Sequence, residues 1–261
     1  MKSPDEAYLQ AARAAARAAG RIQLEGLGTT RTITHKGPFD LVTDVDRLCE
    51  QAIFQILREA FPESGFFGEE NTRTDLEADE VWIVDPLDGT TNYTHGYPHF
   101  SVSIALRRLG RVVLGVVFEP TRQELFEAVR GGGARLNGSP IHVSDTTELA
   151  RSLLATGFPY DRCQNPDNNL ERFAALTLCT LGVRRGGSAA LDLAFTACGR
   201  VDGYWELRLQ PYDVSAGALL VEEAGGQITD LQGGAFDWTG SDFLASNSLL
   251  HQTLLESLSP P

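Results

Sequence analysis

Two aspartates three positions apart, Asp85 and Asp88, stand at the end of an apolar run and are the strongest candidates for chemistry in this sequence. The run 81–84 is β-branched or aromatic and predicts a buried strand, while Pro86 and Gly89 predict that the strand ends where the acids begin. Across a proline-containing bend both carboxylates can face one point, whereas neighbours on a strand alternate between its faces. Convergent carboxylates repel each other unless a cation joins them. Oxygen ligands of this kind suit Mg²⁺, which takes its remaining ligands from water and substrate phosphate.

The residues that follow Gly89 add a feature of a different kind. Thr90, Thr91 and Asn92 can begin a helix whose N–H groups and hydroxyls hold an anion. A metal bound by the aspartates and a phosphate bound by this helix start would then be neighbours. Asp-Gly between two β-prone runs is also a hairpin signal, and residues 100–106 alternate like a second strand. These residues alone leave both a plain turn and a metal–phosphate site open.

Three segments, taken together, resemble the inositol monophosphatase family. They are Trp-Ile-Val-Asp-Pro-Leu-Asp-Gly-Thr-Thr-Asn at 82–92, Gly-Glu-Glu at 68–70, and Tyr-Asp-Val-Ser-Ala-Gly at 212–217 followed by Glu-Ala-Gly-Gly at 223–226. The resemblance implies a sugar phosphatase type of fold, α+β and α/β in class, with two subdomains in a layered α-β-α-β-α sandwich. It also implies a lithium-sensitive, Mg²⁺-dependent phosphatase that is usually a homodimer.

The same resemblance assigns roles to individual residues of this chain. The implied ligands of two Mg²⁺ ions, or three, are Glu69, Asp85, the carbonyl of Leu87, Asp88 and Asp213. The residues implied to activate water are Glu69 and the pair of Thr90 with Asp46. The residues implied to contact phosphate and polyol are Gly89, Thr90, Gly187, Ser188, Ala189 and Glu206.

Without the resemblance, several of these residues have ordinary structural interpretations. Asp46 and Asp213 each fall in the first turn of an expected helix, where a carboxylate usually caps the helix and interacts favourably with its dipole. Glu69 and Glu70 are typical of a solvated turn. Gly187 and Ser188 are typical of tight packing at a helix start.

Other polar residues near the motifs leave alternatives open. Lys36 either faces a phosphate from a hairpin or flap at 26–38, or is an ordinary solvated lysine. Arg184 and Arg185 either bind a second phosphate or are surface charges. His95 and His99 are four apart, but the glycine and proline between them favour a loop over a helical zinc site.

Hydrophobic periodicity predicts the elements that position these residues. A capped, alanine-rich helix runs from Pro4 to about residue 24, and a second helix from Asp44 to just before Pro62. An antiparallel meander is expected over 100–143. Strands and helices then alternate, including helices over 166–181 and 248–258. The polar stretch 144–147 predicts a boundary between an N-terminal α+β subdomain, 1–145, and a C-terminal α/β subdomain, 146–261.

Composition narrows the partners and the compartment. The 261 residues carry a formal net charge of −13, which disfavours nucleic acids and anionic membranes as partners. The polar start and the lack of a long apolar run predict a cytoplasmic protein. The four cysteines are scattered without zinc-like spacing, so reduced structural thiols are expected.

The expected activity is hydrolysis of a small polyol phosphate by metal-activated water, with myo-inositol 1-phosphate as the first candidate. Alternatives in the same superfamily are fructose-1,6-bisphosphatase, histidinol-phosphate phosphatase and nucleotide 3′-phosphatase. An alternative of another class is a non-catalytic regulatory or binding protein on this fold, although such a relative would be expected to have lost at least one acid.

Overall fold

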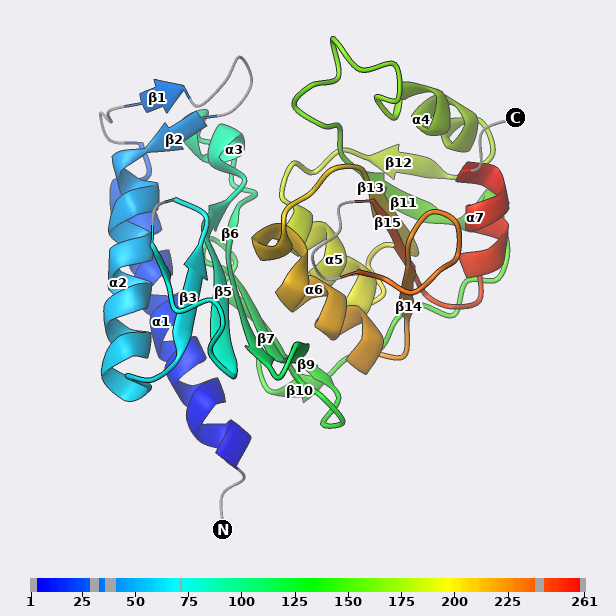
Figure 1. Cartoon of the computed structure of the whole chain (residues 1–261). Coiled ribbons are helices and arrows are strands. Elements are labelled where there is room, and N and C mark those ends of the chain that lie inside the picture. The colour runs from blue at the N-terminus through cyan, green and yellow to red at the C-terminus, as the bar shows by residue number, and fades with distance from the viewer. Residues whose placement is uncertain (1–3, 29–32, 36–40, 71, 238–241, 259–261) are drawn as a thin grey trace.

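A computed structural model of the chain describes residues 4–28, 33–35, 41–70, 72–237 and 242–258. Its elements form five layers in the order helices, sheet, helices, sheet, helices (Figure 1). This is the layered sandwich that the sequence predicts. Within the described residues, no helix is both long and apolar enough to cross a membrane.

The first two layers come from the N-terminal part of the chain. Helices α1 and α2 pack side by side on one face of an eight-stranded mixed sheet, whose strand order is β10-β9-β8-β7-β6-β5-β3-β4 (Figure 1). The elements are α1 Pro4–Gly26, β1 Ile33–His35, β2 Leu41–Thr43, α2 Asp44–Ala60, β3 Gly65–Gly68, β4 Arg73–Thr74, β5 Glu80–Asp88, α3 Thr90–Thr94, β6 Ser101–Arg108, β7 Arg111–Glu119, β8 Glu124–Val129, β9 Ala134–Leu136 and β10 Ser139–Pro140. Strands β6 to β10 form the expected antiparallel meander.

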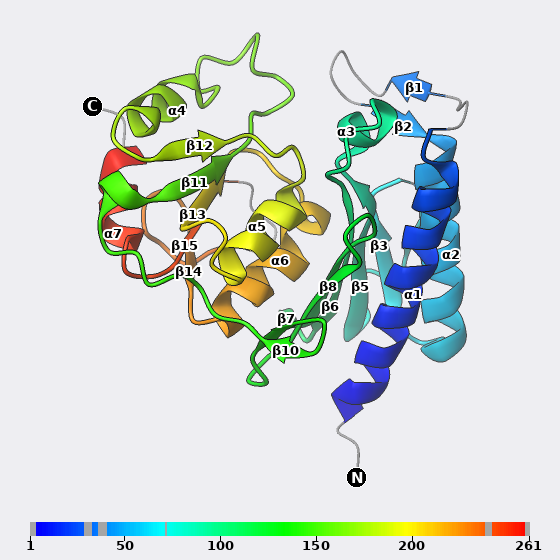
Figure 2. The same ribbon diagram turned by 180° about the vertical axis from the view of Figure 1, so that it is seen from behind.

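The other three layers follow along the chain. Helices α5 and α6 lie between the two sheets, and α4 and α7 cover the outer face of a five-stranded sheet of order β12-β11-β13-β15-β14 (Figure 2). The elements are a 3₁₀ turn at Leu149–Arg151, β11 Leu153–Thr156, α4 Leu170–Thr177, β12 Gly182–Arg184, α5 Ala189–Ala197, β13 Gly203–Glu206, α6 Pro211–Glu223, β14 Gln227–Thr229, β15 Phe243–Ser246 and α7 His251–Leu258. The predicted subdomain boundary falls between β10 and β11 and stays a prediction.

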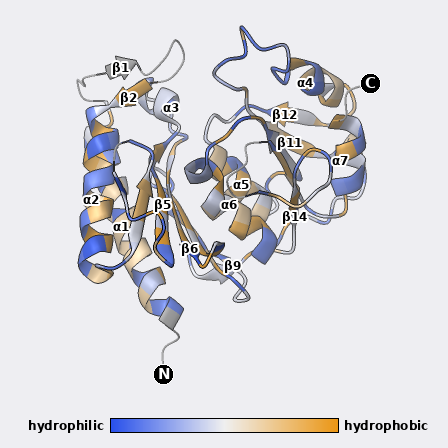
Figure 3. Ribbon diagram, viewed as in Figure 1, coloured by the Kyte–Doolittle hydropathy of each residue, from blue (hydrophilic) through white to orange (hydrophobic). Residues whose placement is uncertain are grey.

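Packing between the layers depends on small residues. Ala12, Ala15, Ala16 and Ala19 of α1 are fully buried against α2 and the first sheet. On the other face of that sheet, a Cβ on Gly115 would lie 2.7 Å from the carbonyl oxygen of Ala216, so α6 rests directly on β7. In Figure 3, α1 and α2 alternate between hydrophilic and hydrophobic segments, as amphipathic helices do.

Strand β5 differs from its prediction at the motif. The sequence predicts that the strand ends before Asp85, but β5 continues to Asp88 through an irregularity in its pairing with β6. Pro86 lacks an N–H, so it fits where the ladder is interrupted. From the buried side of α1, Gln23 Nε2 donates to the Pro86 carbonyl at 2.8 Å. The interpretation of Asp-Gly as a plain hairpin turn is wrong, because helix α3 lies between β5 and β6.

Two helices begin later than predicted, and asparagines explain both late starts, whereas α4 also ends earlier than predicted, at Thr177. Helix α4 begins at Leu170 because Asn165 and Asn168 side chains accept the N–H groups of Asp167 and Leu170, holding that stretch in turns. Helix α7 begins at His251, after Asn247 Oδ1 has accepted the Leu250 N–H. All four cysteines are free, and Cys49 is buried as a structural thiol would be, whereas Cys163 and Cys179 are exposed.

Candidate active site

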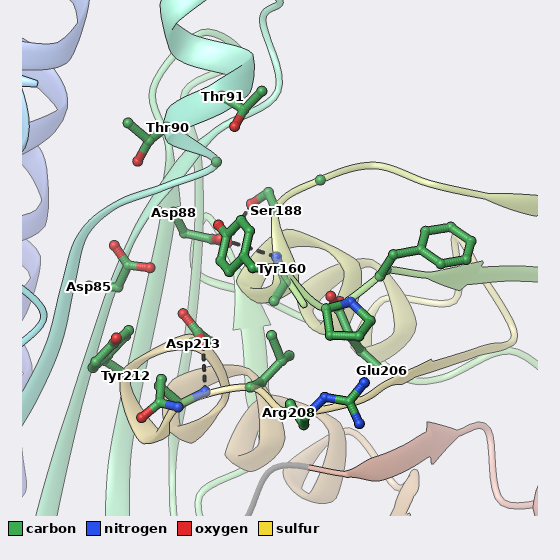
Figure 4. A pocket seen from close by; sticks show the side chains of 18 of the residues that line it. Asp85, Asp88, Thr90, Thr91, Tyr160, Ser188, Glu206, Arg208, Tyr212 and Asp213 are labelled. Atoms are coloured by element: carbon green, nitrogen blue, oxygen red, sulfur yellow. Dashed lines mark hydrogen bonds between the residues drawn. The ribbon is translucent and has the colours of Figure 1, made fainter. Parts of the chain in front are cut away.

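One pocket collects nearly all of the residues that the sequence singles out. It opens between the C-terminal end of β5, the start of α3 and the N-termini of α5 and α6 (Figure 4). The predicted site residues that line it are Glu69, Asp85, Leu87, Asp88, Gly89, Thr90, Arg185, Gly187, Ser188, Ala189, Glu206 and Asp213. Asp46 lies behind the pocket wall, Arg184 lies outside the pocket, and Lys36 lies outside the described residues.

Asp85 and Leu87 belong to the irregular end of β5. Asp85 is 2% exposed, and its Oδ1 accepts the Leu87 N–H at 2.9 Å. Burial raises the pKa of Asp85 well above its usual range, and repulsion from Glu69, Asp88 and Asp213 raises it further. The side chain therefore sits among other carboxylates in a place where a cation would be strongly favoured.

Asp88 connects the motif to the second half of the chain. Its Oδ2 accepts from Ser188 Oγ at 2.5 Å and from the Ala190 N–H at 2.8 Å, and its Oδ1 accepts the Ala189 N–H at 3.2 Å. Burial raises its pKa, while these hydrogen bonds act in the opposite direction. Asp88 therefore faces the pocket and also caps α5, a helix of the second half of the chain. Its position in the sequence does not reveal this capping role.

Asp46 and Thr90 form a hydrogen-bonded pair. Thr90 Oγ1 lies 3.0 Å from Asp46 Oδ1 and 3.1 Å from the Leu87 carbonyl oxygen. The other oxygen of Asp46 accepts from both the N–H and the hydroxyl of Thr43, which precedes α2. Asp46 is fully buried, and burial raises its pKa against the effect of these hydrogen bonds.

Glu69 stands on the loop after β3, and the sequence does not identify what holds that loop. Its N–H donates to the Val84 carbonyl at 3.1 Å, which places it next to β5. Glu50 of α2 accepts from the N–H groups of Glu70 and Thr72, both at 2.9 Å, and from Thr72 Oγ1 at 2.7 Å. The sequence does give one indication of this role, because Glu50 is a charged residue on the buried face of an amphipathic helix, beside positions 46, 49, 53 and 57.

Asp213 reaches the pocket from the first turn of α6. Its Oδ2 accepts the Gln210 N–H at 2.7 Å (Figure 4). Burial raises its pKa well above the usual range, and the nearby Glu69 and Asp88 carboxylates add to the effect. Strand and helix thus bring acids from distant parts of the chain to one cavity.

Glu206 stands on the side of the pocket formed by the second sheet. The Tyr204 hydroxyl donates to Glu206 Oε2, and a Cβ on Gly157 would overlap both carboxylate oxygens. Burial raises the pKa of Glu206 to about 7, against the opposing effect of the tyrosine hydrogen bond. Near neutral pH this group can therefore face substrate hydroxyls either as an acid or as a carboxylate.

The donor set fits a hard divalent cation. Five carboxylates line the pocket, and four of them, Glu69, Asp85, Asp88 and Asp213, lie on the side of Leu87. Mutual repulsion among the acids contributes to the raised pKa values of Asp85 and Asp213. In the part of the chain that the structure describes, no three Asp, Glu, His or Cys side chains are already close enough to enclose an ion. It is the chemistry of the donors, carboxylates and a backbone carbonyl, that fits Mg²⁺.

The pocket also has residues that the sequence interpretation did not include. Its outer wall carries Tyr160, Arg162 and Arg208. Arg208 Nε donates to Asp161 Oδ1 at 3.2 Å, so part of its charge is already balanced. These residues come from loops of the second half, which carry no motif.

Comparisons with known proteins indicate one family for the chain. The model of the inositol monophosphatase family matches residues 5–260. A protein of Pseudomonas aeruginosa named Nus factor SuhB is 44% identical over 253 residues, covering 94% of this chain and 93% of the relative. The inositol-1-monophosphatase of Synechocystis sp. is 43% identical over 255 residues, covering 97% of this chain and 89% of the relative.

Solved structures indicate the same family and the same fold. An inositol monophosphatase from Anabaena (Nostoc) sp. superposes with a TM-score of 0.91 at 44% identity, covering 99% of this chain and 98% of that one. The extragenic suppressor protein suhB from Bartonella henselae gives a TM-score of 0.93 at 40% identity, covering 97% and 98%. The resemblance inferred from the motifs is thereby confirmed.

Proposed function

The chain belongs to the inositol monophosphatase family, and on that premise we propose that it is a Mg²⁺-dependent phosphomonoesterase acting on a small polyol phosphate, with myo-inositol 1-phosphate as the first candidate. One observation carries the proposal. Four carboxylates from three separate segments, Glu69, Asp85, Asp88 and Asp213, line one pocket. The same pocket contains the start of α3 and Glu206, which suit a phosphate and a hydroxylated alcohol.

The carboxylates would hold two Mg²⁺ ions, or three. Glu69, Asp85 and the Leu87 carbonyl would hold the first ion, and Asp85, Asp88 and Asp213 the second. When bound, such ions lower the pKa of water and neutralise charge on phosphate and leaving oxygen. Lithium inhibition would follow from replacement of the second ion.

Thr90 and Asp46 would orient the attacking water. The single hydroxyl proton of Thr90 is directed toward Asp46 Oδ1 or the Leu87 carbonyl. The Thr90 oxygen is therefore left as an acceptor toward the pocket, where it can hold a proton of the water. Glu69 would accept the other proton, and the Gly89 and Thr90 N–H groups would hold the phosphate. Positioning and charge neutralisation of this kind supply most of the catalysis of phosphoryl transfer.

The alcohol would lie against the second half of the molecule. Glu206 would accept from its hydroxyls, and the backbone and side chain at Gly187, Ser188 and Ala189 would complete that surface. Arg185 lines this side of the pocket, so a second phosphate on the substrate, as in fructose 1,6-bisphosphate, is a specific alternative. Arg184 lies outside the pocket and does not support that alternative.

We extend the proposal to assembly and location. A cytoplasmic homodimer is proposed from the family resemblance, with the predicted subdomains 1–145 and 146–261 sharing the site. Exposed leucines on or near α4, at positions 170, 178 and 181, give an apolar surface that a second copy would cover. Sedimentation of the purified protein tests the dimer.

The name of one relative, Nus factor SuhB, does not state a phosphatase activity. We propose catalysis for this chain because all four acids of the proposed metal site, Glu69, Asp85, Asp88 and Asp213, are present in the pocket. A regulatory role would survive a substitution that abolishes phosphate release, so one variant separates the two.

The test is phosphate release from myo-inositol 1-phosphate, fructose 1,6-bisphosphate, histidinol phosphate and adenosine 3′,5′-bisphosphate, with and without Mg²⁺. We expect Mg²⁺-dependent turnover that is highest for the inositol ester and absent in Asp85→Asn. The substituted asparagine would keep an acceptor for the Leu87 N–H, so this variant is cleaner than Asp88→Asn, which would disturb the cap of α5. Turnover by Asp85→Asn at the wild-type rate would contradict the proposal.

A further inference from the structure

Two glycine turns from opposite halves of the molecule meet beside the pocket. Gly89 has a φ of 97° and Gly187 a φ of 85°, both in the region that favours glycine. A Cβ on Gly89 would lie 3.1 Å from the His99 carbonyl oxygen and 3.2 Å from the Gly187 carbonyl oxygen. The turn on the phosphate side therefore almost touches the loop on the alcohol side.

The side-chain amide of Asn92 bridges these two segments. Its Nδ2 donates to the His99 carbonyl at 2.7 Å and to the Gly186 carbonyl at 2.9 Å, and the Gly187 carbonyl lies 3.5 Å away. An amide has two N–H donors, so the two shorter contacts use its full donor capacity. One side chain of α3 thus ties the Gly89 turn to the loop before α5.

The loop before α5 is held at two points of opposite character. Asp88 accepts from Ser188 and from the N–H groups of Ala189 and Ala190, whereas Asn92 donates to the carbonyl of Gly186 in this loop and to that of His99, which follows α3. Asp88 is shared with the proposed metal site. Asn92 does not line the pocket, so its contribution can be changed without touching a residue that faces substrate.

We propose that Asn92 is a positioning residue that sets the separation between the phosphate side and the alcohol side of the pocket, and so determines selectivity for hydroxylated alcohols. The inference rests on the proposed function for the identity of the two sides. Asn92 acts through Gly187, Ser188 and Ala189. Its loss should weaken recognition of a polyol while leaving the handling of phosphate nearly intact.

The test compares Asn92→Ala and Asn92→Asp with Thr94→Ala, a control on the same helix whose hydroxyl makes a local bond to the Thr91 carbonyl. The substrates are myo-inositol 1-phosphate and p-nitrophenyl phosphate, which has no hydroxylated ring. We expect the ratio of the two kcat/KM values to shift at least about tenfold against the inositol ester in both Asn92 variants, chiefly through KM. The shift should be larger for Asn92→Asp, because a carboxylate would face carbonyl oxygens. Equal losses on both substrates, or no loss, would overturn the proposal.

A second measurement keeps this test separate from the proposed function. Amide hydrogen exchange of the Mg²⁺-free protein should accelerate at residues 186–190 in the Asn92 variants but not in Thr94→Ala. If the wild-type protein hydrolysed neither ester, the proposed function would fail, while faster exchange would still support the bridging role. Unchanged exchange at 186–190 would overturn the positioning role.

Discussion

The helix starts at α2 and α6, on opposite sides of the pocket, use the same local pattern for different purposes. Asp46 and Asp213 each stand at the third position of a helix and accept the N–H of the residue before it, Thr43 at 2.8 Å and Gln210 at 2.7 Å. Both oxygens of Asp46 are engaged, because Thr43 and Thr90 hydroxyls also donate to it. Among the described residues, Asp213 receives its hydrogen bonds on Oδ2 alone, and it points into the pocket (Figure 4).

This difference teaches how a cap can be distinguished from a ligand. The two aspartates have the same position relative to their helices, so local sequence cannot separate them. The two roles differ because of hydrogen-bond donors elsewhere in the chain, such as Thr90, which lies 44 positions from Asp46. Asp46, with both oxygens engaged behind the pocket wall, supports structure, whereas Asp213 keeps an oxygen in the cavity and is available to a cation.

Of the two helix-start aspartates, Asp213 is expected to give the larger loss of activity when it is changed to asparagine, in Asp213→Asn. The asparagine oxygen can still accept the Gln210 N–H, so α6 should keep its start. The lost ligand charge should reduce Mg²⁺-dependent phosphate release by about 10³-fold, since charge stabilisation of several kcal/mol is removed. Rate measurements with thermal unfolding check both points. Wild-type turnover would show that Asp213 is only a cap.

Asp46→Ala should have the opposite profile. The free energy of unfolding should fall by about 2–4 kcal/mol, because the cap is lost and buried donors of Thr43 are left unpaired. Turnover should fall only about tenfold through the loss of the Thr90 acceptor. Urea unfolding measures the first effect, with exposed Asp44→Ala as a control expected to stay within about 0.5 kcal/mol. An Asp46→Ala variant that is stable but inactive would contradict the proposal that Asp46, unlike Asp213, acts mainly on stability.

His251 lies outside the site and, like Asp46, has all of its polar side-chain atoms engaged in hydrogen bonds. Its ring nitrogens contact Thr229 Oγ1 at 2.9 Å and Ser246 Oγ at 2.8 Å, and burial lowers the pKa of His251 to about 4. The unfolded chain takes up this proton near pH 6.5, so stability should fall as pH drops from about 6.5 to about 4, by at most about 3 kcal/mol. Unfolding of His251→Gln across this range should show a shallower slope. Exposed His142→Gln should keep the wild-type slope, and identical slopes in both variants would contradict this role.

The smallest effect is expected from Glu50→Gln, which keeps the shape of the side chain but presents an amide to donors of the Glu69 loop. The Mg²⁺ concentration for half-maximal activity should rise about three- to tenfold, because the support behind a ligand typically contributes this much or more. Turnover at saturating Mg²⁺ should change little. Glu59→Gln, exposed on the same helix, is the matched control. A Mg²⁺ dependence identical to that of the wild type would show that Glu50 does not support Mg²⁺ binding.

Sequence reasoning succeeded where chemistry and periodicity coincide. The family, the layered fold, the meander and the buried strand before Asp85 follow from motifs and apolar spacing, and the comparisons and structure confirm them. It failed where a distant partner decides the local outcome. The continuation of β5 depends on its pairing with β6 and on Gln23 of α1, a helix that the sequence marks only as alanine-rich scaffold. The roles of Glu50 and Asn92 depend on loops with no motif.

The close packing of α6 on Gly115 has a consequence for the order in which the chain is synthesised and folds. The sheet that bears Asp85 and Asp88 is specified early in the chain, yet the helix that brings Asp213 to them is synthesised long afterwards. A nascent chain that has formed only the first sheet would present a cluster of acids without the helix that closes it. In the proposed function, metal binding would therefore require the completed fold, and a fragment ending at the meander is expected to purify without the ion.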